Sequence, residues 1–258
     1  MRGNDLNDRS QREYSNVSVI IAAFNEEDSI AEVVRRVSLS LPGAEVLVVH
    51  GGTDGTGRVV QSLARELPRL RLIPNLNDRG KGHAIRVGIA HAAGEVHAQI
   101  DADLQFLPEE LPRLVEPILS QGADITLGSR FMPGSVREPG STPLVRTLGN
   151  LTASLYASLA CRHRITDSQA GIKAWTRAAI LRIGLKSDNY SYEAEIAVKG
   201  ALCGMRVLDI PVTTLKRFTG ITNVNVLIDG LRLLRDITRF WHEGRIGRAR
   251  GRSSSARS

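Results

Sequence analysis

The chain has 258 residues, of which 42% are hydrophobic and 24% charged, and its net charge is +7. A chain of this size can bury a full core without disulfides or a structural metal, and its two cysteines, Cys161 and Cys203, have no metal or redox spacing. It has no apolar stretch of the roughly 18–20 residues that cross a bilayer, and its first 15 residues lack a secretory signal pattern. We therefore expect a cytoplasmic globular protein.

Buried strands alternate with amphipathic helices through the first 130 residues. Short apolar runs predict strands at 17–24, 44–49, 70–74, 96–100 and 124–128, and apolar residues at helical spacing predict helices between them. This alternation predicts an α/β fold, a Rossmann-like and mainly parallel sheet with helices on both faces. Right-handed crossovers then bring the loops at Asn25, Gly51 and Asp101 to one crevice, where open α/β sheets bind ligands.

The pattern changes after residue 130. The segment 131–143 is rich in glycine and proline, which predicts a mobile loop. Helices are predicted at 144–160, 176–183 and 192–203, a late strand at 207–212 in which Pro211 favours an edge position, and an amphipathic helix at 224–241. We expect one domain at 17–241, with halves at 17–130 and 131–241. A disordered arm at 1–16 precedes it, and a disordered Arg/Ser tail at 242–258 follows it.

The positive charge is concentrated in the tail. Residues 242–258 carry +4, the arm is neutral, and the remaining body carries +3. The last helix either packs on the body or lies on an anionic membrane surface with the help of the tail. No aromatic residues are interleaved with the tail arginines, so we expect no nucleic-acid partner.

The segment Asp101-Ala102-Asp103-Leu104-Gln105 directly follows a predicted strand. Two carboxylates and an amide oxygen are the hard ligands that Mg²⁺ or Mn²⁺ takes together with substrate phosphates. The alternative is a helix-entry turn with solvated acids, but the position in the crevice favours the metal. The glycines around Lys81 do not form a Walker A loop, and those at 52–57 do not have dinucleotide-binding spacing.

Several further motifs occur in order along the chain. They are Ser18–Glu27 with its Asn-Glu-Glu turn, Arg79–Gly82 with Gly88, Asp101–Gln105 with Pro108-Glu109, Gly128–Phe131, the group Asp167, Gly171 and Lys173, and Arg217–Thr222. Together they resemble the family 2 glycosyltransferases of the GT-A fold, in particular the polyprenol-phosphate (dolichol-phosphate) mannose and glucose synthases. The resemblance extends from Val17 to about Trp241.

The resemblance implies inverting, metal-dependent transfer of a hexose from a nucleotide-sugar (GDP-mannose or UDP-glucose type) to a polyprenyl phosphate. It places Mg²⁺ or Mn²⁺ on Asp101, Asp103 and Gln105, and phosphates of the donor or acceptor at Arg130 and Arg217, which with Asp103 form the implied catalytic set. Each of these residues has a structural alternative, which for Arg130 is an ion pair within the fold. The implied nucleotide contacts are Ala23, Asn25, Glu27, His50, Asp54, Lys81, Asp101 and Ala102.

One departure from the family pattern concerns the end of the second strand. The family usually has two acids there, whereas this chain has His50-Gly51. The acid that would bond the base is missing, and His50 is the substitute that the sequence offers. The choice between GDP and UDP stays open, and so does a catalytically silent homologue that only binds its ligands.

The nature of the acceptor decides whether a general base is needed. A polyprenyl phosphate is already anionic and needs only positioning. A soluble hydroxyl acceptor, the alternative in the same fold, needs a base, for which Asp167, Glu193 and Glu195 are the candidates. Glu193 and Glu195 could equally be solvated helix acids. With a lipid acceptor we expect a monomer or homodimer that lies peripherally on the cytoplasmic face of the membrane.

Overall fold

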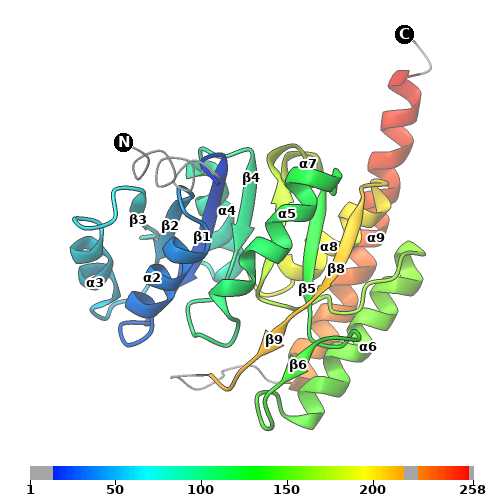
Figure 1. Cartoon of the computed structure of the whole chain (residues 1–258). Helices are drawn as coiled ribbons and strands as arrows, with labels where there is room; N and C mark the ends of the chain where they lie inside the picture. Colours follow the sequence, from blue (N-terminus) through cyan, green and yellow to red (C-terminus); the bar gives the residue numbers. More distant parts are fainter. Residues whose placement is uncertain (1–13, 218–225, 256–258) are drawn as a thin grey trace.

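A seven-stranded sheet forms the centre of the molecule in the computed structural model, which describes residues 14–217 and 226–255 (Figure 1). The strand order is β3-β2-β1-β4-β7-β5-β8. The strands are β1 (Val17–Ala23), β2 (Glu45–His50), β3 (Leu70–Pro74), β4 (Val96–Gln99), β5 (Ile125–Ser129), β7 (Lys173–Thr176) and β8 (Val207–Pro211). All neighbours pair in parallel except β7, which is antiparallel to both β4 and β5. The mainly parallel sheet is thus confirmed, and so is the edge position of the strand that contains Pro211.

Helices cover both faces of the sheet. The first face is covered by α2 (Ile30–Ser40), α3 (Thr56–Leu63), the short helix η1 (Pro108–Glu110) and α5 (Leu111–Gln121). The second is covered by α4 (Lys81–His91), α6 (Leu144–Cys161), α7 (Arg177–Ile183), α8 (Tyr192–Leu202) and α9 (Val226–Ser255). Strand β1 reads as an unbroken apolar run because Val19 and Ile21 face the first layer and Ile20 faces the second.

The segment 131–143 is not the free loop that its glycines and prolines predict. Strand β6 (Val136–Arg137) pairs in parallel with β9 (Thr213–Thr214). The Glu138 amide also donates to the Thr214 carbonyl (2.8 Å), and the Ser135 hydroxyl donates to the Ser129 carbonyl (2.7 Å). The segment is tied down because its backbone groups find partners in the chain that follows β8.

The predicted boundaries at the two termini differ from the structure. Tyr14 is buried and its hydroxyl donates to Glu116 (3.0 Å), so the domain begins before residue 17. The rest of the predicted arm, residues 1–13, lies outside the described residues. Helix α9 continues past Trp241 to Ser255, so the tail that we expected to be disordered is helical through that residue. The run contains no proline, and arginine and alanine favour helix.

Helix α9 packs on α6 and α8, as the first of the two alternatives for this helix predicts (Figure 1). Its buried side chains include Ile237 and Phe240, whereas Leu231 is 71% exposed. Asp236 is also buried, and its carboxylate pairs with Arg239 (3.4 Å). Among the described helices, none is both long and apolar enough to span a bilayer.

Candidate active site

The loops after β1 and β2 are joined by three of the predicted nucleotide contacts. The Asn25 side-chain oxygen accepts from the Thr53 amide (2.9 Å), and the Glu27 carboxylate accepts from the Gly55 amide (2.8 Å). In return, Asp54 accepts from the Glu27 amide (3.0 Å). Burial works against the low pKa of Asp54, but hydrogen bonds, chiefly from Thr56, lower it. The two loops therefore form one edge of the predicted crevice, and direct contact with a nucleotide stays a prediction.

The turn at Asp101–Gln105 follows β4 as predicted. Leu104 adopts a positive φ of 59°, which folds the turn so that the Asp103 carboxylate accepts from the Gln105 amide (3.1 Å). The Gln105 carbonyl in turn accepts from the Leu215 amide (2.8 Å). This contact brings the segment after β9 to the site, where Arg217 forms an ion pair with the buried Asp103 (2.8 Å).

Lys81 lies between two carboxylates. Its ammonium is 2.7 Å from Asp101 and 2.9 Å from Glu193. Burial favours the neutral amine, but the two carboxylates outweigh it and hold the pKa of Lys81 well above its ordinary value. Burial also raises the pKa of Asp101, against the attraction of Lys81. Lys81 is thus a buried ion-pair partner of Asp101, the predicted metal ligand.

The side chains of Asp101, Asp103 and Gln105 fit a divalent metal by their chemistry. They offer two carboxylates and one amide oxygen. In the described part of the chain, no group of three or more His, Cys, Asp and Glu side chains could hold a metal ion by itself. Such a set suits Mg²⁺ or Mn²⁺ that completes its shell with water and substrate phosphates. Gly171 makes room for this arrangement, because a Cβ there would overlap with the Asp101 carboxylate.

Glu26 belongs to the same electrostatic site, although sequence reasoning singled out only its neighbours Asn25 and Glu27. Burial raises its pKa, the hydrogen bond from Ser29 opposes this, and Asp103 adds to the rise. Its position inside the Asn-Glu-Glu turn is the signal that could have identified it. Glu26 therefore adds a third acid to the electrostatics of this end of the crevice.

Arg130 is held by Asp167 in the structure. Its guanidinium donates through two nitrogens to the two carboxylate oxygens of Asp167, at 2.6 and 2.9 Å, and also to the Gln169 carbonyl (3.1 Å). Both side chains are largely buried. Burial opposes the charge of Arg130, yet Asp167 keeps its pKa raised. This is the ion pair named as the structural alternative for Arg130, and a phosphate contact stays a prediction.

The three candidate bases are all buried and paired. Besides the Asp167–Arg130 pair, Glu193 binds Lys81 and accepts from the Tyr192 hydroxyl (3.2 Å). Glu195 is 2.5 Å from Lys199 and accepts from the Ser187 amide (2.9 Å). The alternative that Glu193 and Glu195 are solvated helix acids is wrong, because α8 is buried nearly all round.

Arg146, on the first turn of α6, was missed by sequence reasoning. Burial lowers its pKa, and the nearby cations Arg217 and Arg130 lower it further, so positive charge gathers at this end of the site. The same helix carries an exposed apolar face. Its members expose 41–81% of their surface and are Leu144, Val145, Leu148, Leu151, Leu155 and Leu159. Their spacing shows an amphipathic helix in the sequence, but not which face lacks a protein partner.

The remaining predicted residues lie at the same edge. The carbonyl of the buried Ala23 accepts from the Gly51 amide (3.3 Å), and Ala102, within the turn at Asp101–Gln105, is buried. The His50 ring lies between Gly52 and Gly57, and its Nδ1 is buried with no hydrogen-bond partner among the described residues. Of the late motif, only Arg217 is described, and residues 218–222 lie outside the described range.

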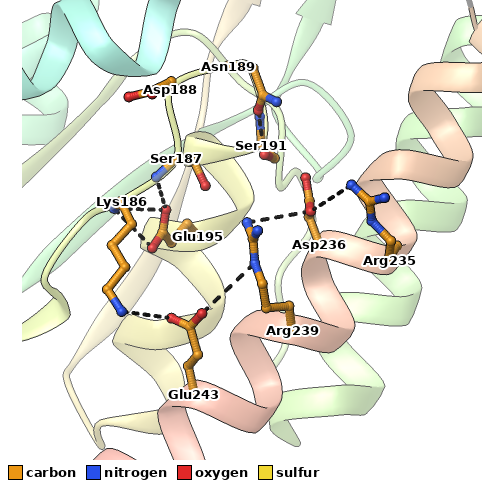
Figure 2. Close-up of a pocket in the computed structure, with 10 residues that line it drawn as sticks. All are labelled: Lys186, Ser187, Asp188, Asn189, Ser191, Glu195, Arg235, Asp236, Arg239 and Glu243. Carbon is orange, nitrogen blue, oxygen red and sulfur yellow. Dashed lines mark hydrogen bonds and ion pairs between the residues drawn. The ribbon is translucent and has the colours of Figure 1, made fainter.

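A polar pocket lies between α9 and the loop that leads into α8 (Figure 2). It is lined by Lys186, Ser187, Asp188, Asn189, Ser191, Glu195, Arg235, Asp236, Arg239 and Glu243. Lys199 of α8 and Glu243 of α9 form an ion pair of 2.7 Å, and Lys186 of the loop lies 3.7 Å from the same carboxylate. The same loop supports the start of α4, where the His83 amide donates to the Asp188 carbonyl (3.0 Å). Because charges of both signs line the pocket and pair with one another, they select no charged ligand.

Known proteins resemble this chain over most of its length. The family model described as "Glycosyl transferase family 2" matches residues 18–176. The polyprenol monophosphomannose synthase of Mycolicibacterium smegmatis is 29% identical, with 90% of this chain and 89% of the relative covered. The undecaprenyl-phosphate mannosyltransferase of Micrococcus luteus is 31% identical, with 79% of this chain and 85% of the relative covered.

Solved structures confirm the fold. The glucosyl-3-phosphoglycerate synthase of Mycobacterium tuberculosis, crystallised with Mn²⁺, UDP and glucosyl-3-phosphoglycerate, superposes with a TM-score of 0.66 at 19% identity. The match covers 91% of this chain and 81% of the other. The fold is therefore that of the GT-A glycosyltransferases, as the motifs predicted.

Proposed function

We propose that this chain, which belongs to glycosyl transferase family 2 and is a glycosyltransferase, transfers a hexose from a nucleotide-sugar to a polyprenyl phosphate. The observation that carries the choice of acceptor is the state of the three candidate bases. Asp167, Glu193 and Glu195 are each buried in an ion pair, so none is poised to deprotonate a hydroxyl. A phosphate acceptor needs no base, because its oxygen is already ionised at neutral pH.

The positive charge beside Asp103 supports a phosphate at this place. Arg217 and Arg146 lie at the same end of the crevice, close enough that the charge of Arg217 helps to lower the pKa of Arg146. Guanidinium groups match phosphate oxygens in geometry as well as in charge. We assign these two arginines to the acceptor phosphate. Arg130 has a structural role in the site through its ion pair with Asp167.

The apolar face of α6 supports a lipid on that phosphate. Arg146 lies on the first turn of the helix, and exposed leucines follow it as far as Leu159. A polyprenyl chain or the membrane that holds it can cover this face, which is otherwise costly to leave in water. The relatives named above carry polyprenyl acceptors in their names, in agreement with this assignment. Peripheral attachment would then occur through α6.

The donor diphosphate belongs at Asp101 and Asp103. A divalent metal held by these carboxylates and Gln105 would neutralise the charge that develops on the departing nucleoside diphosphate. The acceptor phosphate oxygen forms the new bond to the anomeric carbon as the bond to the diphosphate breaks, which inverts the configuration. Lys81 holds Asp101 in place through the ion pair that Glu193 also shares.

A transfer assay with a matched variant tests this function. The full chain is incubated with Mn²⁺, labelled GDP-mannose or UDP-glucose, and undecaprenyl phosphate in vesicles, and label in the lipid fraction is counted. We expect transfer by the wild type and a loss of at least about 100-fold in Asp103→Asn, since both the metal and Arg217 lose a charged partner. Label transfer that is unchanged in Asp103→Asn would overturn the metal assignment. Nucleotide binding without transfer to any acceptor would instead indicate the silent homologue.

A further inference from the structure

Asp78 lies where the second strand ends, although it comes from the loop after β3. An ideal Cβ built on Gly51 would lie 2.8 Å from the Cβ of Asp78 and 3.1 Å from its Oδ2. A side chain at residue 51 and the present position of Asp78 therefore exclude each other. Residues 50 and 51 carry no carboxylate at the end of this strand, and the carboxylate of Asp78 lies there instead.

The two carboxylate oxygens of Asp78 have different surroundings. Oδ1 accepts from the Asn75 side-chain amide (2.7 Å) and from the Gly80 backbone amide (3.2 Å). Asn75 is itself buried, and its backbone amide donates to the His50 carbonyl (2.8 Å), which fixes the loop to the end of β2. Oδ2 accepts no hydrogen bond from the described part of the chain. Asp78 thus presents one fixed and unused acceptor beside Gly51.

The order of the strands places a nucleoside near this acceptor. The diphosphate belongs at the end of β4, and the two arginines assigned to the acceptor, Arg146 and Arg217, come from the segments that follow β5 and β8. The nucleoside must then extend the other way, over the ends of β1, β2 and β3, where Asn25, His50 and Asp78 follow one another. His50 is a weaker candidate for base recognition because its Nδ1 is buried.

We propose that Asp78 Oδ2 accepts a hydrogen bond from a ring N–H of the donor's base, so that Asp78 determines nucleotide specificity. Guanine and uracil carry such an N–H on their pairing edge, whereas adenine and cytosine present a bare ring nitrogen there. The inference rests on the proposed function for the presence of a nucleotide-sugar. It goes beyond that function by assigning the base to a residue outside the motifs.

The variant Asp78→Asn reverses the polarity of this group while it keeps the loop. Because the Asn75 and Gly80 amides both donate, the new amide must turn its oxygen toward them and its NH₂ group toward the base. An acceptor is thereby exchanged for a donor at the Oδ2 position. Gly51→Ala provides an independent variant, because its Cβ displaces Asp78 without altering it.

Calorimetric titration with Mn²⁺ and four nucleotides tests the assignment without any transfer step. For the wild type we expect tighter binding of UDP than of CDP, or of GDP than of ADP. In Asp78→Asn and in Gly51→Ala that ratio should fall by about 10- to 100-fold, the range of a hydrogen bond to a charged group. Asp124→Asn, at the opposite end of the sheet, is the matched control and should leave the ratio unchanged.

The other outcomes are distinct. Unchanged ratios in both variants overturn the role of Asp78, and so does equal weakening of all four nucleotides, since that would indicate ribose or phosphate contact. If the wild type binds no nucleotide, the donor half of the proposed function fails, and the role of Asp78 fails with it. If binding and its ratio behave as expected but no sugar is transferred, only the proposed function fails.

Discussion

Lys173 is a buried lysine whose charge lowers the stability of the folded protein. It lies on β7 at the centre of the sheet, is 1% exposed, and its ammonium is 5.7 Å from the centre of the Tyr192 ring. Burial lowers the pKa of Lys173 from 10.5 to about 8, with Glu193 opposing the shift and Lys81 adding to it. A charged amine is thus retained beneath the site at the expense of stability.

Removing this amine should stabilise the protein at neutral pH. The unfolded chain holds the Lys173 proton up to a pH of about 10.5, whereas the folded chain releases it above about 8. Unfolding therefore takes up a proton between these values, and the contribution of Lys173 to the free energy of unfolding rises with pH there. Lys173→Met should raise that free energy by on the order of 3 kcal/mol at pH 7, and the gain should shrink toward pH 10.

Thermal melts of both proteins between pH 7 and pH 10 measure this change. Lys186→Met, which removes an exposed lysine, is the control and should leave the pH profile unaltered. A gain in Lys173→Met that stays constant across the whole range would show that the amine does not titrate there.

Gly171 matters because it has no side chain and so leaves room for the Asp101 carboxylate. A methyl group at this position would overlap with the Asp101 carboxylate and push it away from the predicted metal position. Gly171→Ala should weaken Mn²⁺ binding by about 10-fold or more, because a ligand displaced by even 1 Å loses its coordination geometry. Titration of the full chain with Mn²⁺ gives the dissociation constant. Gly230→Ala, where a Cβ meets nothing within 4 Å, is the control, and equal affinities in the two variants would contradict the assignment.

Among the helices, α6 rather than α9 carries the exposed apolar face. Of the two alternatives for α9, packing on the body is the one observed, because Ile237 and Phe240 are buried against it. Helix α6 carries the apolar face that lacks a partner among the described residues. Both helices are amphipathic in sequence, and periodicity alone cannot tell which face meets protein and which meets lipid.

Replacing two leucines of α6 should weaken binding to lipid vesicles. Leu148 and Leu155 are 65% and 61% exposed, and burial of each side chain in a membrane contributes about 1.5–3 kcal/mol of free energy to binding. The double variant Leu148→Ser with Leu155→Ser should therefore bind at least about 10-fold less. Sedimentation with vesicles that contain an anionic lipid measures the bound fraction. Leu181→Ser removes a leucine of α7 that is 69% exposed and should bind like the wild type; equal loss in both would contradict a specific face.

The arginine-rich end of α9 should contribute only an ionic component. A chain that ends at Gly244 keeps the Glu243–Lys199 ion pair and loses all five tail arginines. Each arginine near an anionic surface is worth about 1 kcal/mol at low salt, and screening removes this contribution at high salt. We expect weaker vesicle binding by the truncated chain in low salt and equal binding in 0.5 M salt, on the order of three to four times the physiological ionic strength. If the truncated chain and the full chain bind vesicles equally at both salt concentrations, the tail is not an anchor.

For the molecule as a whole, the sequence predicts the sheet well and its side-chain network poorly. Buried apolar runs such as β1 and β2 are unambiguous, and they determine the edge of the sheet at which the loops with Asn25 and Asp101 lie. Strand β7 was not predicted, because it is four residues long and begins with a lysine. The Lys81–Glu193 pair joins residues that are 112 positions apart, and no local pattern reports such a contact. The same holds for Asp78 beside Gly51, which only the folded loop reveals.

In the proposed reaction a phosphate, not a hydroxyl, receives the sugar. The most direct measurement offers the wild-type chain three acceptors with Mn²⁺ and the donor that it binds: undecaprenyl phosphate, undecaprenol, and a soluble phosphorylated hydroxy acid. Mass spectrometry of each acceptor then detects the gain of one hexose. The buried and paired state of Asp167, Glu193 and Glu195 predicts a gain on undecaprenyl phosphate alone. A gain on undecaprenol or on the soluble acceptor, with none on the lipid phosphate, would contradict it.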